Sequence, residues 1–376
     1  MSTSTPPKRI IDLDEDCLLE IFSHIHDLQG LISLCSIGER WKAIIYKNRL
    51  KSVKYLMRFD SNREPKLAKD TVYFHGYGPL IVTDQVNLFP NIEVLDLRAK
   101  LDKKLNENDI LHFVNKANKL KGLIQEGRYF SEEIIKKCEN LEMLATTGTH
   151  LGPYLEEYVC KIKQLKLRCY SLDELSHNPR NLCNLERPNI SVGSVGMYNG
   201  PKLMKLKILE MSFTSKYGFE FLNYCPGLES VYLLIKSNKH IVSGSTNRAN
   251  GSECSQEWSS LWTLLVRYPN LKHLALRGNS SIFDIDVKEL VALLPNLELV
   301  DFRKCDGITV ESLNFVQKFS AMQNRVINLY CNVNEEQMKV DLPHLSYDPD
   351  CIVKEFDLMR HCFAKDFENL PYFIGV

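Results

Sequence analysis

Apolar residues near the start of the chain follow the period of a helix and predict a small helical head. The spacing i, i+3, i+4, i+7 marks one helix face of about three turns, formed by Leu18, Ile21, Phe22 and Ile25. Asp14 precedes this run, where its carboxylate can cap the helix by accepting a hydrogen bond from a free amide. We expect Gly30 to break the chain before a second apolar segment, residues 31–35, and a third segment spans residues 39–47. Helices this short bury little surface alone, so we expect them to pack against a partner or against the rest of the chain.

A second pattern, Leu-x-x-Leu-x-Leu, recurs from residue 92 onward and predicts short strands with alternate side chains pointing inward. Its apolar positions are Ile92, Leu95, Leu97; Leu141, Leu144; Ile162, Leu165, Leu167; Leu206, Leu209, Met211; Leu228, Val231, Leu233; Leu271, Leu274, Leu276; Leu297, Val300, Phe302; and Ile327, Leu329. Residues 120–123 and 182–185 match weakly, as degenerate units would. Where the pattern is clearest, neighbouring units lie 21 to 26 residues apart, which is the period of leucine-rich repeats.

Repeated units of this kind predict an α/β solenoid. One unit cannot bury its apolar side chains, so units stack into a curved parallel sheet that forms the concave side. Residues 284–294 and 309–319 have helical spacing and should lie on the convex side. The alternative is a different α/β protein in which these are ordinary strand–helix units.

Composition narrows the class of protein. The chain has 376 residues and a formal net charge of zero, which argues against a general nucleic-acid binder. No apolar run approaches the length of about 18 residues that a membrane span needs, and the polar start does not resemble a secretory signal. We therefore expect a soluble protein of the cytoplasm, the nucleus or both. The 12 cysteines form no CxxC pair, so we interpret most of them as small buried hydrophobes and predict no metal and no cofactor.

The head resembles the F-box family. The matching residues are Leu13, Glu15, Leu18, Ile21, Phe22, Leu31, Leu34, Cys35, Arg40 and Trp41. Two features depart from the family pattern: Asp14 stands where the family usually has proline, and residues 36–39 are less basic and one residue longer than usual. With the repeats, and with Cys305 placed as in the cysteine-containing repeat, the chain resembles the F-box/leucine-rich-repeat proteins.

That resemblance implies a substrate receptor of an SCF-type ubiquitin ligase, which is not itself an enzyme. The head would dock on a Skp-type adaptor and through it on a cullin ligase core, and the repeats would hold a target protein for ubiquitylation. The adaptor-binding positions would be Leu13, Asp14, Leu18, Ile21, Phe22, Leu31 and Trp41. Two alternatives stay open: the head only caps the apolar edge of the repeats, or the protein is an interaction scaffold without a link to ubiquitylation.

The concave face is the expected target site. On each strand the residues between the inward leucines face it, and the candidates are Asp96, Arg98, Lys166, Arg168, Glu210, Tyr232, Arg277, Asp301, Arg303 and Tyr330. The arginines at 98, 168, 277 and 303 share one slot of the repeat and could form a row for acidic or phosphorylated segments. Alternatively, they are solvated and paired with neighbours such as Asp96 or Asp301.

The resulting domain organisation is a disordered start (1–9), an F-box (10–50), a linker and N-terminal cap (51–90), irregular repeats (91–331) and a C-terminal cap (332–376). The polar segment 237–257 is predicted to be a loop inserted in the repeats. Phosphate-binding, zinc-protease and nucleophile-elbow motifs are missing from the sequence. An enzyme would need a site hidden in the insertion or the tail.

Overall fold

The computed structural model describes residues 9–59, 69–75, 88–97, 107–125, 132–146, 161–169, 172–176, 182–192, 196–213, 217–235, 261–279 and 281–334. The chain divides into two compact units, with the boundary close to residue 141. The segment 237–257 and nearly all of the predicted cap 332–376 lie outside the described residues.

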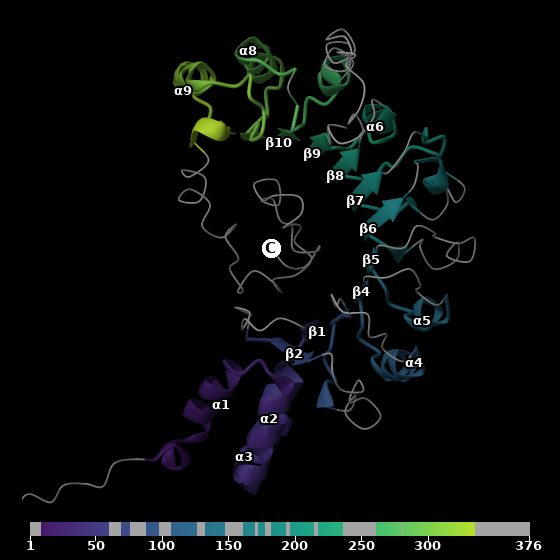
Figure 1. Ribbon diagram of the computed structural model, residues 1–376, viewed down its shortest axis with the longest axis vertical. Coiled ribbons are helices and arrows are strands. Elements are labelled where there is room, and N and C mark those ends of the chain that lie inside the picture. The colour runs from purple at the N-terminus through teal and green to yellow at the C-terminus, as the bar shows by residue number, and fades with distance from the viewer. Residues whose placement is uncertain are drawn as a thin grey trace, which may run out of the picture. The chain divides into compact units, whose positions relative to one another are not determined.

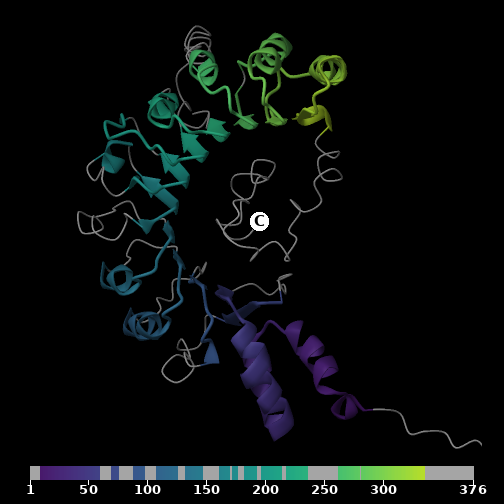
Figure 2. The ribbon, with the colours of Figure 1, turned by 180° about the vertical axis from the view of Figure 1, so that it is seen from behind.

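The head consists of three short helices at the start of the first unit (Figures 1 and 2). They are α1 (Glu15–Ser23), α2 (Leu28–Leu34) and α3 (Glu39–Ile44), and α3 continues as a π-helical turn, η3 (Ile45–Arg49). Asp14 caps α1 as predicted, because its carboxylate accepts a hydrogen bond from the Cys17 amide at 2.8 Å. The expected break at Gly30 is wrong. Gly30 lies in the first turn of α2, where its amide donates to the carboxylate of the N-cap residue Asp27 at 2.8 Å.

The head packs against the first strands of the sheet through backbone and side-chain hydrogen bonds. The Tyr73 amide donates to the His26 carbonyl, and His26 Nδ1 lies 2.8 Å from the Thr71 carbonyl oxygen. Arg49, fully buried, donates to the carbonyl oxygens of Phe22 at 2.9 Å and Thr71 at 3.2 Å. Its burial lowers the guanidinium pKa to about 10. The small head is thus packed in part against its own chain, which was one of the two alternatives expected from its size.

The first unit has four parallel strands in the order β2-β1-β3-β4. They are β1 (Tyr55–Phe59), β2 (Thr71–His75), β3 (Val94–Asp96) and β4 (Gly122–Gln125), accompanied by α4 (Glu107–Lys116) and α5 (Glu132–Lys137). The leucine pattern predicts β3 and β4 but not β1 and β2.

The second unit continues the repeat with strands in chain order, and every strand pair assigned within it is parallel. Its strands are β5 (Met143–Thr146), β6 (Gln164–Cys169), β7 (Arg187–Val192), β8 (Ile208–Phe213), β9 (Ser230–Ile235), β10 (His273–Arg277), β11 (Leu299–Asp301) and β12 (Asn328–Tyr330). Its described α-helices include α6 (Tyr217–Glu220), α8 (Asp284–Leu293) and α9 (Val310–Gln323), which lie along one side of the strands (Figure 1).

The core of each repeat is built from the inward positions of the strands. Leu209, Val231, Leu274 and Val300 are fully buried and stand in register on four neighbouring strands. Helices α8 and α9 occupy the segments in which the sequence predicts helices. The parallel sheet and its repeated units therefore confirm the predicted α/β repeat fold.

Candidate functional site

The residues predicted to bind an adaptor divide into core and surface positions. Leu18, Phe22, Leu31 and Trp41 are at most 6% exposed, and the rings of Phe22 and Trp41 meet edge to face at 5.1 Å. These four therefore hold the helices of the head together. The remaining three are accessible: Leu13 and Ile21 are half-buried and Asp14 is exposed.

Apolar surface remains around the turns of the head. Ile10 and Ile11, in the turn η1 (Ile10–Asp12), are 50% and 43% exposed, and Ile37, in the turn η2 (Cys35–Ile37), is 53% exposed. Arg40 of α3 holds the first of these turns in place, because its guanidinium donates to the carbonyl oxygens of Ile11 at 3.1 Å and Leu13 at 2.5 Å. We call Ile10, Ile11, Leu13 and Ile37 the head surface. Sequence reasoning missed its three isoleucines because they stand in turns without helical periodicity.

Strand register arranges the predicted target-binding residues into rows on one face of the second unit. Paired Cα positions run across the strands from Lys166 through Asn189, Glu210, Tyr232, Ala275 and Asp301 to Tyr330. A neighbouring row runs from Arg168 through Ser191, Ser212 and Leu234 to Arg277. We call this face, with Arg187 and Arg303, the charged face. The register thus places Arg168 and Arg277 in one row, as their shared repeat slot predicts.

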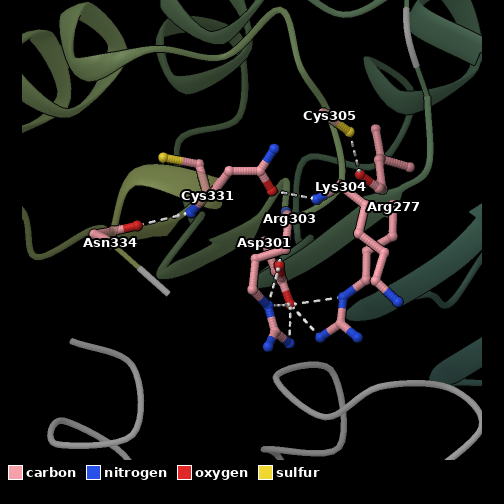
Figure 3. Close-up of polar contacts among 9 residues, drawn as sticks. Arg277, Asp301, Arg303, Lys304, Cys305, Cys331 and Asn334 are labelled. Atoms are coloured by element: carbon pink, nitrogen blue, oxygen red, sulfur yellow. Dashed lines mark hydrogen bonds and ion pairs between the residues drawn. The ribbon is translucent and has the colours of Figure 1, made fainter. Parts of the chain in front are cut away.

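One carboxylate on the charged face binds two arginines (Figure 3). Asp301 accepts hydrogen bonds from Arg277 at 2.5 and 3.0 Å, and from Arg303 at 3.0 Å through both Nε and Nη2. Arg277 also lies over the Tyr232 ring, with 5.0 Å from Cζ to the ring centre. Asp301 is fully buried and neither arginine is more than 4% exposed, so these arginines are paired with Asp301 but are not solvated surface.

A second charged cluster lies on β7 and β8. Arg187 donates to Glu210 Oε1 at 2.5 and 3.2 Å, and Asn189 donates to Glu210 Oε2 at 2.8 Å. Arg187 and Glu210 are each 1% exposed. The sequence predicts Glu210 as a face residue but misses Arg187, because the strand RPNISV carries proline, isoleucine and valine at its inward positions in place of leucine.

The other predicted positions are placed as follows. Asp96 belongs to the first unit, is fully buried and accepts a hydrogen bond from the Tyr55 hydroxyl at 2.7 Å. Lys166 is half-buried and Tyr330 is buried. Arg98 and the side chain of Arg168 lie outside the described residues.

Guanidinium groups dominate the charged face, and the carboxylates that they bind in this structure are those of Glu210 and Asp301. The nearby thiol of Cys305 is an unreactive structural group, because it is fully buried, donates to the Leu276 carbonyl at 3.1 Å and has its pKa raised to about 12 by burial. In the described part of the chain, His, Cys, Asp and Glu side chains form no group of three or more that could hold a metal ion. Of the helices described, none has both the length and the apolar character to cross a membrane.

Comparison with solved structures gives distant likenesses, which include the following two. A chain from the crystal structure of the Rad7 and Elc1 complex in yeast is 14% identical, with a TM-score of 0.33, and the match covers 78% of this chain and 89% of that one. A leucine-rich-repeat protein of Leptospira interrogans is 13% identical, with a TM-score of 0.30, over 87% of this chain and 99% of that one. No protein-family model and no curated protein matches the sequence. Both TM-scores are low, so the fold assignment rests on the register and repeat pattern of this chain.

Proposed function

We propose that this protein is the substrate-recognition subunit of an SCF-type ubiquitin ligase. In this proposal the head docks on a Skp-type adaptor, the repeats hold a target protein, and other subunits transfer ubiquitin. The chain is then a non-catalytic receptor of the cytoplasm, the nucleus or both. The resemblance of residues 10–50 to the F-box supports this function.

The observation that carries the proposal is the exposed head surface. The core of the head is closed, since Leu18 and Leu31 are fully buried, yet Ile10, Ile11 and Ile37 stay 43% to 53% exposed. Covering an isoleucine fully is worth about 1.5–3 kcal/mol, and a half-exposed one gains roughly half of that. Three such isoleucines, with the exposed Asp14 on the same head, suit a protein interface that combines apolar and polar contacts.

The charged face supports the second half of the proposal. Arg187, Arg277 and Arg303 are buried and held by Glu210 and Asp301, so they fix the shape of this face, and the half-buried Lys166 is its charged group within reach of a target. Acidic or phosphorylated target segments fit such a face best.

The direct test is binding of the purified full-length chain to a Skp-type adaptor. Replacing Ile11 and Ile37 together by glutamate places two charges in the proposed contact and leaves the buried core of the head untouched. We expect adaptor binding to weaken at least about tenfold, the cost of roughly 1.4 kcal/mol or more. Met322→Glu, at a residue of α9 that is 80% exposed, is the matched control and should bind as the original chain does.

Failure of the unmodified chain to bind the adaptor, or equal binding by the double variant, overturns the proposal. Adaptor binding without ubiquitylation of a captured target by the reconstituted ligase would favour the scaffold alternative. Leu18 and Phe22 are unsuitable for this test, because their replacement would remove packing inside the head.

A further inference from the structure

The residue immediately before each of the strands β5 to β11 is charged, and its sign alternates from one strand to the next. In chain order these residues are Glu142, Lys163, Glu186, Lys207, Glu229, Lys272 and Glu298. We call these seven residues the charge ladder. The leucine pattern does not require a charge at this position, so the alternation needs a physical reason of its own.

Backbone hydrogen bonds make consecutive residues of the charge ladder direct neighbours. From Lys163 onward, the amide of each one donates to the carbonyl oxygen of the one before it, at 2.8 to 3.0 Å. Neighbouring strands lie about 4.8 Å apart, so the next charge of the same sign is two strands away, at roughly 10 Å. That distance is about one Debye length at 0.1 M salt. Each side chain therefore interacts mainly with the opposite charges on the two adjacent strands.

Ion pairs between the side chains follow this order. Lys163 Nζ lies 2.9 Å from the Glu142 carboxylate. Glu229 lies between two lysines, with its carboxylate 3.0 Å from Lys272 Nζ and 3.9 Å from Lys207 Nζ. Its pKa is lowered, chiefly by the hydrogen bond from Lys272, and the charge of Lys207 contributes in the same direction. Glu229 is thus stabilised from both of its neighbouring strands.

The first unit has the same alternation. Lys54, Glu93 and Lys121 precede the neighbouring strands β1, β3 and β4, and their backbones are linked in the same way. Glu93 again lies between two lysines, 3.3 Å from Lys121 Nζ and 3.6 Å from Lys54 Nζ. The pattern therefore occurs independently in both units.

Apolar packing alone distinguishes poorly between one repeat and another. The inward positions on the strands are similar in size and all buried: Leu144, Leu165, Leu209, Val231, Leu274 and Val300. Because hydrophobic burial is not directional, a stack that skips one repeat would bury almost the same apolar groups. Skipping one repeat, however, would place equal charges side by side, which destabilises neighbouring strands.

We propose that the charge ladder fixes the order in which the repeats stack. Each repeat is electrostatically compatible with its two neighbours in sequence and incompatible with the next repeat but one. An exposed ion pair stabilises little by itself, so the effect of the charge ladder lies in the repulsion that a wrong order would create. This role needs neither an adaptor nor a target and goes beyond the proposed function.

A charge swap in the full-length chain distinguishes the charge ladder from a set of separate ion pairs. Glu229→Lys combined with Lys272→Glu keeps this pair and the net charge, but it creates a repulsive contact with Lys207 on one side and with Glu298 on the other. At about 0.01 M salt we expect hydrogen exchange of the amides in β8 to β10 to become at least about threefold faster. At about 1 M salt, where the Debye length falls to roughly 3 Å, most of this difference should disappear.

A rescue variant and a control complete the experiment. Adding Lys207→Glu and Glu298→Lys to the swap leaves a single repulsive contact, with Glu186, and should recover part of the lost protection. The control is Glu289→Lys with Lys318→Glu, at exposed positions of α8 and α9, which should leave exchange in β8 to β10 unchanged. Original exchange rates in the swap variant, a loss that persists at high salt, or no recovery in the rescue variant would each overturn the proposal.

Discussion

Asp301 is the residue on which the charged face depends most. Its carboxylate accepts hydrogen bonds from Arg277 and Arg303 and is itself fully buried. The buried guanidinium groups of Arg277 and Arg303 thus both bind the single negative charge of the Asp301 carboxylate. Loss of that charge would leave both cations in a poorly solvated place, which costs more than the hydrogen bonds alone.

Replacing Asp301 by asparagine should therefore destabilise the protein strongly. We expect a loss of about 3–5 kcal/mol in the free energy of unfolding, the usual cost of removing one partner from a buried ion pair. Urea denaturation of the full-length chain measures this. Asp306→Asn is the control, since Asp306 is exposed on the loop after β11 and its change should have little effect. If Asp301→Asn and Asp306→Asn lowered the free energy of unfolding equally, the buried ion pairs of Asp301 would not contribute to stability as described.

The buried cysteines should react slowly with alkylating reagents, and this reactivity can be measured. Cys138 and Cys305 have pKa values raised to about 12 by burial, and burial also raises the pKa of Cys225. Thiolate is the reactive form, so these three should resist alkylation by iodoacetamide at pH 8 while exposed Cys183 is labelled. Peptide mapping by mass spectrometry reads this out. Rapid labelling of Cys305 in the folded protein would contradict the packing described for the last repeats.

At the scale of elements, Asp284 connects two successive repeats. Located in the first turn of α8, it accepts hydrogen bonds from the Thr309 amide at 2.9 Å, the Thr309 hydroxyl at 2.7 Å and the Ser312 hydroxyl at 2.5 Å. Partial desolvation raises the pKa of this carboxyl, but the hydrogen bonds from Ser312 and Thr309 outweigh it, and the pKa lies below its ordinary value. The ionised carboxylate therefore holds α8 and α9 together.

This shift makes a pH dependence predictable. Because the folded-state pKa of Asp284 is lowered, its stabilisation is complete above the unfolded-state pKa of about 4 and is lost as the pH falls through the folded-state value. Asp284→Asn should lose about 1 kcal/mol at pH 6, and its difference from the original chain should shrink toward pH 3. Urea midpoints at both pH values test this. A difference that is the same at both pH values would exclude the carboxylate as its source.

Arg49 offers a test of how the head is attached. Its guanidinium bridges the carbonyl oxygens of Phe22 and Ile25 in the head to that of Thr71 on β2. Arg49→Met should speed hydrogen exchange in α1 to α3 severalfold and leave β9 to β11 unchanged, because the second unit folds around its own core. Lys51→Met, at an exposed position, should alter neither. Uniformly faster exchange throughout the chain would show that the head does not open separately.

The sequence predicts the elements well where packing imposes a period. Strands β8 to β12 lie where the leucine pattern places them, because each must bury alternate residues against the next repeat. Strands β1 and β2 were missed because YLMRF and TVYFH lack that pattern, and β2 joins the sheet beside β1, out of chain order.

Site residues are harder to predict for a related physical reason. Helical periodicity identifies the face that is buried, so it selected Leu18 and Phe22, which form the core of the head. Exposed residues in turns follow no period, so periodicity did not point to Ile10, Ile11 and Ile37, which we propose as contact residues. On the sheet, alternation did identify Glu210, Arg277 and Asp301, because a strand's side chains must point to opposite faces.

At the scale of the whole molecule, two surfaces of different chemistry support the proposed receptor. The head surface is apolar and carries no metal-binding or nucleophilic group among its residues, which suits docking on a stable partner. The charged face is polar and is ordered by buried guanidinium–carboxylate pairs, and we propose it as the target-binding surface. This difference is what an adaptor protein with two unlike partners requires.

Hydrogen exchange on the full-length chain with and without a purified Skp-type adaptor tests the central claim most directly. We predict protection of the backbone amides of residues 10–13 and 34–41, with the amides of β10 and β11 unchanged. Absence of protection at residues 10–13 and 34–41 at saturating adaptor, or protection confined to the strands of the second unit, would contradict the proposal that the head is the docking site.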